Sequence, residues 1–380
     1  MPRLALSRLL AFVVLMTLAL PAPAWVRAQD ATPVTVAGGQ GTVVADGLVN
    51  PRGFTWGADG ALYVGIAGTG GDTPGPEGSP FFGGDTAAVV TVRDGAVSTL
   101  AEGLPSSVWR DIDWAWGVMD LAILGDQLYA LEGGGGAIHG NPDAPSGVYA
   151  VFADGTTSLI ADLGTWVDEN PVAHEPWEGV PNNGSFFAMV PVGEALWVVE
   201  SVNGQVLEVT PDGAVTRIAD LSEGHPVPSG IAAAPTGGAY VGMLTAAPYP
   251  QGTAKVVHVA ADGTVEDAWT GLTAVTGVAV GPDGALYAAE IATEMTDADP
   301  FFAPGTGRIM RQTGPESMEE VAFGLDLPVA LRVGPDDALY VAVPAFGAND
   351  GTGSIVRLDL SLTGEAGGAG MATPVATPSA

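Results

Sequence analysis

Three glutamates occupy the same position in a repeated phrase and could act together in chemistry. Glu132, Glu200 and Glu290 each lie three residues after an aromatic residue of that phrase. Convergent carboxylates bind a hard cation such as Ca²⁺ through their oxygens, so these three residues and Asp120 are the candidate metal ligands. Alternatively, each carboxylate accepts hydrogen bonds from neighbouring N–H groups and locks its loop. In either case we expect the glutamates around the mouth of one axial channel.

Further ligand-binding candidates stand where the innermost strands of the repeats are expected to begin. They are Arg52, Trp116, Asp120, Asn183 and Ser229. Arg52 belongs to an Asn-Pro-Arg-Gly step, and a guanidinium there can hold a ligand carboxylate through two parallel hydrogen bonds. It can equally neutralise nearby acids. Together with the three glutamates, these residues predict a binding site at the channel mouth.

Two long segments, 104–120 and 165–184, carry five of the nine tryptophans. These are Trp109, Trp114, Trp116, Trp166 and Trp177. Aromatic rings interleaved with acids can stack on a sugar or another ring-shaped ligand. Alternatively, the rings form a small apolar core for the long segments themselves. A small molecule, a glycan or a protein is therefore the expected partner.

Composition and missing motifs exclude several function classes. The chain has no Gly-x-Ser-x-Gly, no Walker Gly-Lys-Ser/Thr and no His-Glu-x-x-His, which are signatures of hydrolases, nucleotide-binding proteins and metalloproteases. Its four histidines lack ligand spacing, and we expect His139, His174 and His225 at the surface. The absence of cysteine excludes a thiolate nucleophile and cysteine-ligated metals. A net charge of −31 argues against a nucleic-acid partner.

A sixfold repeat defines the elements that must position these residues. In each unit a turn leads into an alternating strand with one aromatic residue: Tyr63, Tyr129, Trp197, Tyr240, Tyr287 and Tyr340. A short apolar strand precedes each turn, and a second hairpin recurs at 90–104, 149–164, 206–221, 256–272 and 309–325. Four antiparallel strands in a unit are typical of a propeller blade. The chain is therefore predicted to be an all-β, six-bladed β-propeller.

The ring is expected to close through the N-terminal strand. The last unit ends after its third strand, at 354–360, whereas the segment 39–48 resembles a fourth strand. Joining it to the last blade removes two exposed sheet edges. Small residues ten positions before four of the aromatic anchors suit strands crowded around an axis. The long connections 65–86, 104–116, 132–146, 164–186 and 290–306 all belong to one face, called here the elaborated face, where binding usually occurs.

The two ends of the chain predict its destination and boundaries. Arg3 and Arg8 accompany an apolar run over 9–20, and small residues precede Ala28; this pattern is typical of a secretory signal peptide. We expect a signal peptide at 1–28, a linker at 29–36, the propeller at 37–361 and a disordered tail at 362–380. The protein is therefore expected to be secreted, periplasmic or extracellular, without a membrane segment after cleavage.

The fourth and fifth units resemble the ScyD/ScyE family of NHL-type propellers. The likeness lies in Tyr240-Val241-Gly242-Met243-Leu244-Thr245-Ala246, in Tyr249-Pro250 and in Gly252-Thr253-Ala254, and the first unit adds Asn50-Pro51-Arg52-Gly53 and Pro74-Gly75-Pro76-Glu77-Gly78. Met243 replaces the usual glutamate, and Met119 stands before Asp120 where a histidine is expected. The resemblance implies a secreted propeller. The two departures weaken the expectation of a metal site shared with the family.

Two hypotheses for function remain. The first is a non-catalytic binding or scaffold protein that uses the elaborated face and the channel mouth. The second is a Ca²⁺-dependent enzyme of the lactonase or lyase type with an axial active site, since such enzymes resemble this chain in their repeat phrase. Only Asp120, Asn183 and the three glutamates are available as ligands for that second hypothesis.

Overall fold

The computed structural model describes residues 33–36, 39–176, 184–314 and 317–359. This part of the chain is almost entirely β, with one short helix, α1 (Leu163–Glu169), and one 3-10 turn, η1 (Ala137–His139). The predicted signal peptide at 1–28, the tail at 362–380 and the candidate Asn183 lie outside the described residues. Within the described ranges, no helix is long and apolar enough to cross a membrane.

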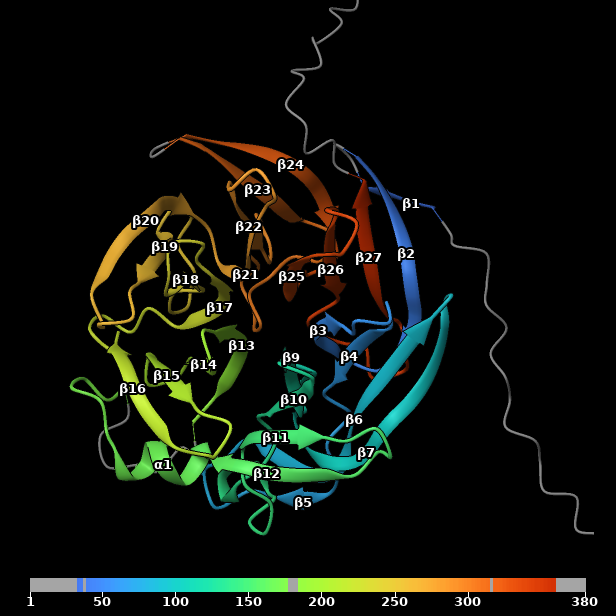
Figure 1. Ribbon diagram of the computed structural model, residues 1–380, viewed down its shortest axis with the longest axis vertical. Coiled ribbons are helices and arrows are strands. Elements are labelled where there is room, and N and C mark those ends of the chain that lie inside the picture. Colours follow the sequence, from blue (N-terminus) through green and yellow to red (C-terminus); the bar gives the residue numbers. More distant parts are fainter. Residues whose placement is uncertain (1–32, 37–38, 177–183, 315–316, 360–380) are drawn as a thin grey trace, which may run out of the picture.

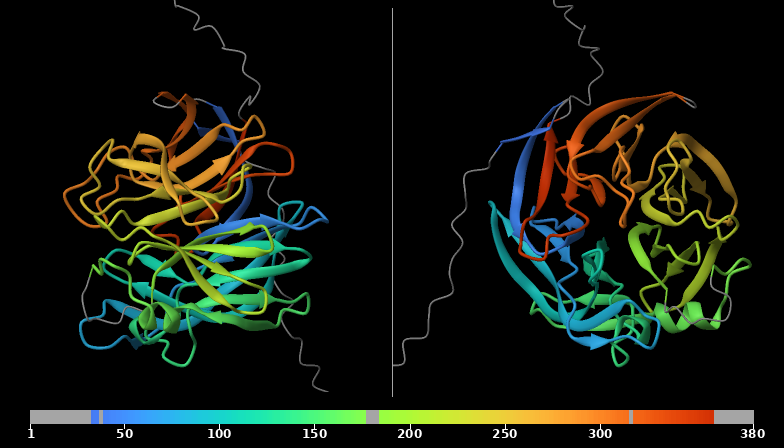
Figure 2. Two further views of the ribbon diagram at one scale, coloured as in Figure 1. Left: turned by 60° about the vertical axis from the view of Figure 1, so that its left-hand side comes forward. Right: turned by 180° about the vertical axis from the view of Figure 1, so that it is seen from behind.

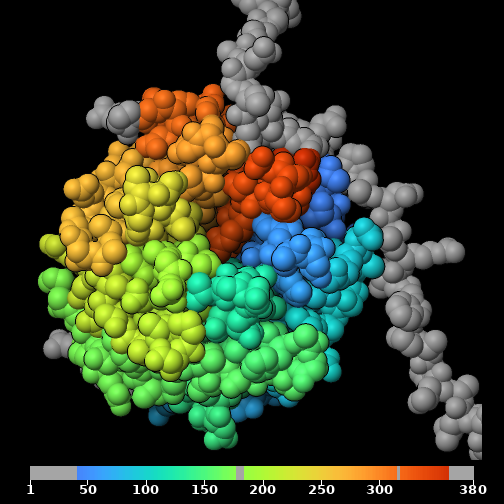
Figure 3. Space-filling view, viewed as in Figure 1, coloured from blue at the N-terminus to red at the C-terminus, as the bar shows by residue number. Residues whose placement is uncertain are grey.

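Six antiparallel sheets form a ring around a central axis (Figure 1). The innermost strand of each is β3 (Pro51–Trp56), β9 (Val118–Leu124), β13 (Phe186–Val192), β17 (Pro228–Ala233), β21 (Val275–Val280) or β25 (Ala330–Val333). The same ring is seen from behind (Figure 2), and a space-filling view shows the blades meeting around the centre (Figure 3). The six-bladed β-propeller predicted from the repeat is confirmed.

Blades two to five each add three strands outward, in chain order. Blade two has β10 (Gln127–Glu132), β11 (Gly147–Val151) and β12 (Thr157–Asp162), and blade three has β14 (Ala195–Glu200), β15 (Gln205–Val209) and β16 (Val215–Asp220). Blade four has β18 (Ala239–Met243), β19 (Ala254–Val259) and β20 (Val265–Leu272), and blade five has β22 (Leu286–Glu290), β23 (Gly307–Gly314) and β24 (Ser317–Leu325).

Blade six contains strands from both ends of the chain. Its inner strands are β25, β26 (Leu339–Val343) and β27 (Gly353–Asp359). The fourth strand is β2 (Gly39–Leu48), which pairs antiparallel with β27 and carries β1 (Pro33–Val36) at its outer edge. The predicted closure of the ring by the N-terminal strand is therefore confirmed.

Blade one extends further than the repeat indicated. It consists of β3, β4 (Leu62–Ile66), β6 (Phe81–Arg93) and β7 (Ala96–Trp109), with β8 (Trp114–Trp116) beside β7 and β5 (Thr73–Pro74) beside β6. The segment 104–116, expected to be a loop, is thus largely strand. Its apolar residues face a partner, since Val108 pairs with Phe82 and the Trp109 ring meets Phe81 edge-on at 6.1 Å.

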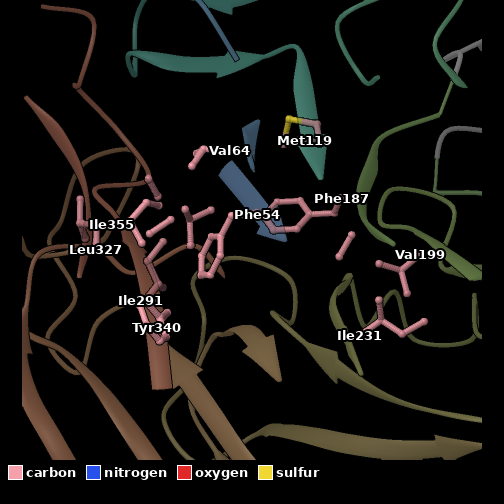
Figure 4. Close-up of a cluster of buried hydrophobic side chains, with 14 of the residues drawn as sticks. Phe54, Val64, Met119, Phe187, Val199, Ile231, Ile291, Leu327, Tyr340 and Ile355 are labelled. Carbon is pink, nitrogen blue, oxygen red and sulfur yellow. The ribbon is translucent and has the colours of Figure 1, made fainter. Parts of the chain in front are cut away.

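The hydrophobic core lies mainly between neighbouring blades. One cluster joins blades two and three, where Leu131 and Val148 pack with Leu196 and Val198. A larger cluster includes Phe54 of blade one and Phe187 of blade three, both shown in Figure 4. Because each blade buries its faces against the next, the ring is needed for burial of apolar surface, which is the main stabilising contribution to folding.

Small residues let the inner strands approach one another closely. A Cβ atom added to Gly230 would lie 2.9 Å from the Cα of Gly277, and one added to Gly277 would lie 2.8 Å from the nitrogen of Leu331. At Gly53 it would lie 1.8 Å from Oδ1 of Asp120. The glycine in blade one therefore makes room for an acid from blade two, which matters for the channel described below.

Candidate functional site

A cavity of about 420 Å³ lies on the elaborated face, at the mouth of the axial channel. It is called here the mouth pocket. Eight of its lining residues are aromatic: Trp109, Trp114, Trp116, Phe187, Tyr249, Phe301, Phe302 and Phe346. They come from β7, β8, β13 and the connections that follow β18, β22 and β26. As expected, the connections that lead into the inner hairpins and the connections that leave them meet on this face.

The aromatic side chains form one connected wall. Trp114 lies 5.3 Å from Trp116 and 4.3 Å from Phe346, measured between ring centroids. Phe302 continues the wall, at 6.1 Å from Phe346 and 4.5 Å from Tyr249. Rings packed at these distances and tilts attract one another and hold their orientation. The pocket is therefore a preformed apolar surface suited to another ring.

Three bulky residues of the pocket have an unfavourable backbone conformation. Val227, Tyr249 and Phe301 have φ angles of 55°, 57° and 70°, and all three line the mouth pocket. A left-handed conformation costs about 1–2 kcal/mol for a residue with a Cβ atom, and a β-branched side chain such as valine makes it rarer. Strain of this kind is concentrated at functional sites. Among the described residues, three of the eleven non-glycine residues with positive φ thus line this one pocket.

Most hydroxyl groups in the pocket wall are already used to join neighbouring blades. Ser201 donates to the carbonyl of Pro228 at 2.5 Å, Ser229 to that of Val275 at 2.5 Å and Thr276 to that of Pro328 at 2.7 Å. The predicted site residue Ser229 does line the pocket, but its hydrogen is committed to the next blade. These hydroxyls are poor candidates for nucleophiles.

Trp116, one of the predicted binding residues, lines the mouth pocket. Its Nε1 donates to Oγ of Ser185 at 3.2 Å, and its ring meets Phe81 at 4.8 Å. The other predicted tryptophans lie in different parts of the molecule. Trp109 and Trp114 also line the pocket, whereas Trp166 is on α1 beneath Arg217, whose Cζ lies 5.5 Å from the ring centroid. Trp177 lies outside the described residues.

Below the pocket the axial channel narrows to a cavity of only about 10 Å³, called here the waist. Asp120 and Arg332 cross it, with Nη2 of Arg332 2.6 Å from Oδ2 of Asp120. Asp120 also accepts the N–H groups of Met189 and Leu121, both at 2.8 Å. Burial raises the pKa of Asp120, and the charge and hydrogen bonds of its partners oppose that shift. The pair closes the channel and joins blades two, three and six.

Arg52 lines the waist but lacks an acidic partner. Its side chain is fully buried, and it donates to two carbonyls: Nη1 to Pro51 at 3.1 Å and Nη2 to Ala115 at 2.7 Å. Its Nε has no acceptor, and its Cζ lies 5.3 Å from the centroid of Trp114. The suggestion that it neutralises nearby acids is wrong, because the acid in the waist pairs with Arg332 instead.

The three predicted glutamates are buried, but each serves its own blade. Glu200 accepts the N–H groups of Ser185 at 3.0 Å, Val202 at 2.9 Å and Asn203 at 3.0 Å. Glu290 accepts the N–H of Thr273 at 2.8 Å and pairs with Nε of Arg308 at 2.5 Å. Burial raises the pKa of both carboxyls, against the opposing effect of these bonds.

The carboxylate of Glu132 has fewer hydrogen-bond partners than those of Glu200 and Glu290. Its Oε1 accepts the N–H of Gly134 at 2.6 Å, whereas its buried Oε2 has no partner. Burial raises the pKa of Glu132 well above its usual value, and the N–H groups of Gly134 and Gly133 oppose that shift only in part. Of the three glutamates, this one has the environment that most favours the neutral acid.

The predicted gathering of these carboxylates around a cation is not found. Among the described residues, no group of three or more histidine, aspartate or glutamate side chains is placed to hold a metal ion. Glu132, Glu200, Glu290 and Asp120 instead direct their oxygens to backbone N–H groups or arginines. They do not fit a shared Ca²⁺ site, because separate protein donors engage each of them: loop N–H groups for Glu132 and Glu200, Thr273 and Arg308 for Glu290, and Arg332 of another blade for Asp120.

His139 differs from the expected surface position. It is buried on η1, its Nδ1 lies 2.7 Å from Oγ of Ser107, and its ring packs 4.5 Å from Phe81. Burial lowers the pKa of His139 to about 3, so the ring is neutral and structural. It supports the wall behind Trp116, at 5.9 Å between centroids.

The most important pocket residues were missed in the sequence. Tyr249, Phe301, Phe302 and Phe346 lie in connections without repeat periodicity, and Phe187 reads as an ordinary strand residue. A signal existed in the long connections of blades four and five, where an aromatic residue lies beside a proline, as in Tyr249-Pro250 and Pro300-Phe301. Only the closed ring brings these rings against Trp114.

Comparisons with solved structures find propellers of the same kind. A gluconolactonase from Xanthomonas campestris has 13% identity, with 88% of this chain and 99% of that chain covered and a TM-score of 0.54. A Thermus thermophilus protein, provisionally assigned as an oxidoreductase (glucose dehydrogenase), has 17% identity, coverage of 84% and 100%, and a TM-score of 0.53. A Bacteroides thetaiotaomicron protein of unknown function has 12% identity, coverage of 84% and 75%, and a TM-score of 0.52.

The comparisons with sequences add no closer relative. No protein-family model matches the chain, and no curated protein matches it. The resemblance to the ScyD/ScyE family therefore stays a prediction. At identities of 12–17% the structural likeness shows architecture and no activity. The chain is a six-bladed β-propeller, and this fold is what it shares with the solved structures.

Proposed function

We propose that this protein is a non-catalytic binding protein whose mouth pocket takes a small, largely apolar molecule containing aromatic rings. The observation that carries the proposal is the pocket itself, about 420 Å³ in volume and walled by eight aromatic side chains. Small-molecule sites are concave, mostly apolar and largely preformed, with few polar groups. Backbone strain at Val227, Tyr249 and Phe301 supports the same conclusion.

Binding is favoured over catalysis by the state of the polar groups. A hydrolytic or lyase reaction needs a group free to transfer a proton or to hold a metal. In the described pocket wall, Ser201, Ser229 and Thr276 donate to backbone carbonyls. The stretch that resembles ScyD/ScyE proteins supplies Leu244 and Tyr249 to this wall, so the resemblance and the pocket involve the same residues.

Filling the pocket tests the proposal. The neutral fluorescent probe N-phenyl-1-naphthylamine should bind the full chain, and Leu244→Trp should weaken that binding at least about 10-fold, because the larger ring occupies the cavity. Leu159→Trp is the matched control, since Leu159 is exposed on β12 and does not line the pocket. Probe fluorescence and intrinsic tryptophan fluorescence report the affinity.

Two results would reject this proposal. One is that the unaltered protein does not bind the neutral probe at all. The other is that Leu244→Trp and Leu159→Trp bind it equally well while both remain folded by circular dichroism, since the probe would then sit elsewhere on the surface.

A further inference from the structure

We infer that the ligand of the mouth pocket carries one anionic oxygen group, such as a carboxylate or sulfonate, which is held by Arg52 at the floor of the pocket. The inference rests on the proposed function and narrows the class of ligand. A purely apolar ring compound would satisfy the pocket wall and leave the floor without its counter-charge.

The floor of the pocket is formed by the waist of the channel. The two cavities share Phe187, Ser229 and Thr276 as lining residues, so they adjoin. Arg52 lines the waist, and the Trp114 ring that it approaches lines the pocket. The guanidinium therefore lies next to the bottom of the apolar cavity. The waist holds about 10 Å³, room for about one water, so the anionic group lies at the pocket floor and contacts Arg52 directly or through one water.

The hydrogen bonds of Arg52 leave it able to take an anion. A guanidinium has five N–H groups and no acceptor, and the two carbonyls of Pro51 and Ala115 take one each from Nη1 and Nη2. Nε has no acceptor. The side chain is 1% exposed, and burial lowers its pKa to about 9, so the group is charged at neutral pH.

The charges of the waist do not balance. Its lining contains two arginines, Arg52 and Arg332, and one acid, Asp120, and that acid is paired with Arg332. One buried positive charge therefore remains, in a protein whose net charge is −31. Burying an unpaired charge is costly, and an incoming anion would supply the missing partner through charge-assisted hydrogen bonds.

The charge at the rim of the pocket sets the direction of binding. Asp299 also lines the pocket, but it is exposed, so water and salt weaken its field. Interactions with Arg52 take place in a less polar medium, where they are stronger. The anionic group should therefore point inward to Arg52, with the rings between Trp114, Tyr249 and Phe302.

A matched pair of probes tests this on the unaltered protein. 8-Anilinonaphthalene-1-sulfonate and N-phenyl-1-naphthylamine share the same ring system and differ in the sulfonate. We expect the sulfonate probe to bind at least about 10-fold more tightly, the effect of a hydrogen bond to a charged group. Equal affinities would overturn the inference while leaving the proposed function intact; absence of binding by both probes would overturn both.

Variants identify the residue responsible. Arg52→Met keeps length and removes the charge, and should reduce the preference for the sulfonate probe to near one while the neutral probe still binds. Arg52→Lys should keep part of the preference. Arg93→Met is the control, because Arg93 is exposed and paired with Asp59 on the surface; it should keep the full preference. An unchanged preference in folded Arg52→Met would contradict the inference.

Should Arg52→Met fail to fold, the unaltered protein still decides the matter. Benzenesulfonate should compete with the bound neutral probe at least about 10-fold more strongly than benzyl alcohol, a neutral ring of similar size. Equal competition by the two compounds would overturn the inference.

Discussion

A buried glutamate at the end of the second strand in blades two, three and five shows how one residue type can serve structure rather than chemistry. In each case the carboxylate accepts N–H groups of the connection that follows or precedes it, as Glu200 does with Ser185 and Asn203. The positions were evident from the repeat. Their role was not, because a glutamate at this position of the repeat has the same sequence pattern whether its loop or a cation supplies the partners of the carboxylate.

The pH dependence of stability distinguishes Glu132 from its equivalents. Burial raises the pKa of Glu132 in the folded protein, so the folded state holds the proton more tightly than the unfolded chain does. Its contribution to stability is therefore greatest below the usual pKa of 4.5 and is lost as the pH rises through the folded-state pKa. Glu132→Gln, which cannot ionise, should escape that loss.

We expect the free energy of unfolding of Glu132→Gln, relative to the unaltered protein, to increase between about pH 5 and about pH 8 by more than the ~0.5 kcal/mol typical of surface changes. Urea unfolding at each pH measures it. Glu194→Gln, at an exposed turn position, is the control. A constant difference across this range would show that burial does not favour the neutral acid.

The inner strands illustrate what an element contributes. Five of their six equivalent positions hold glycine or alanine: Gly53, Ala188, Gly230, Gly277 and Ala330. Asp120 is the exception and occupies the sixth. It fits because Gly53, across the contact between β3 and β9, has no Cβ. The same acid then reaches Arg332 on β25. The missing Cβ of Gly53 on β3 thus leaves room for the ion pair between Asp120 on β9 and Arg332 on β25.

Substitution at this position should show coupling between strands. Gly53→Ala places a Cβ 1.8 Å from Oδ1 of Asp120 and should destabilise the protein by about 1–3 kcal/mol, as overpacking usually does. Asp120→Ala should also destabilise it, since Arg332 loses its partner. The double variant should cost less than the sum of the two, because the clash is gone. Chemical unfolding measures all four proteins, and strict additivity would argue against the contact.

At the scale of the whole molecule, closure of the ring stabilises the fold, whereas the excess of negative charge destabilises it. The pairing of β2 with β27 closes the ring and gives blade six its fourth strand. Against this, 43 acidic residues face 12 basic ones. The described residues include nine ion pairs, most of them partly exposed, and such pairs contribute little. Repulsion among the remaining acids should therefore dominate the response to salt.

Added salt should stabilise the protein. Raising sodium chloride from about 10 mM to about 1 M shortens the screening length from about 30 Å to about 3 Å, and the unfolding temperature should rise by several degrees. Sucrose at equal osmolality is the control for general solute effects. An unfolding temperature that falls with salt would mean that the ion pairs outweigh the repulsion.

The sequence by itself determined the number of blades, the strand that closes the ring and the face that carries the long connections. These follow from local patterns, because turns and alternating strands depend on neighbouring residues. Tertiary structure alone decided which side chains meet. The mouth pocket joins residues as distant in sequence as Trp109 and Phe346, and the waist joins Asp120 to Arg332, 212 positions apart. The partner of a buried charge comes from another blade, so only the closed ring decides whether that charge is paired. The sequence therefore could not show that Arg52 lacks an acidic partner.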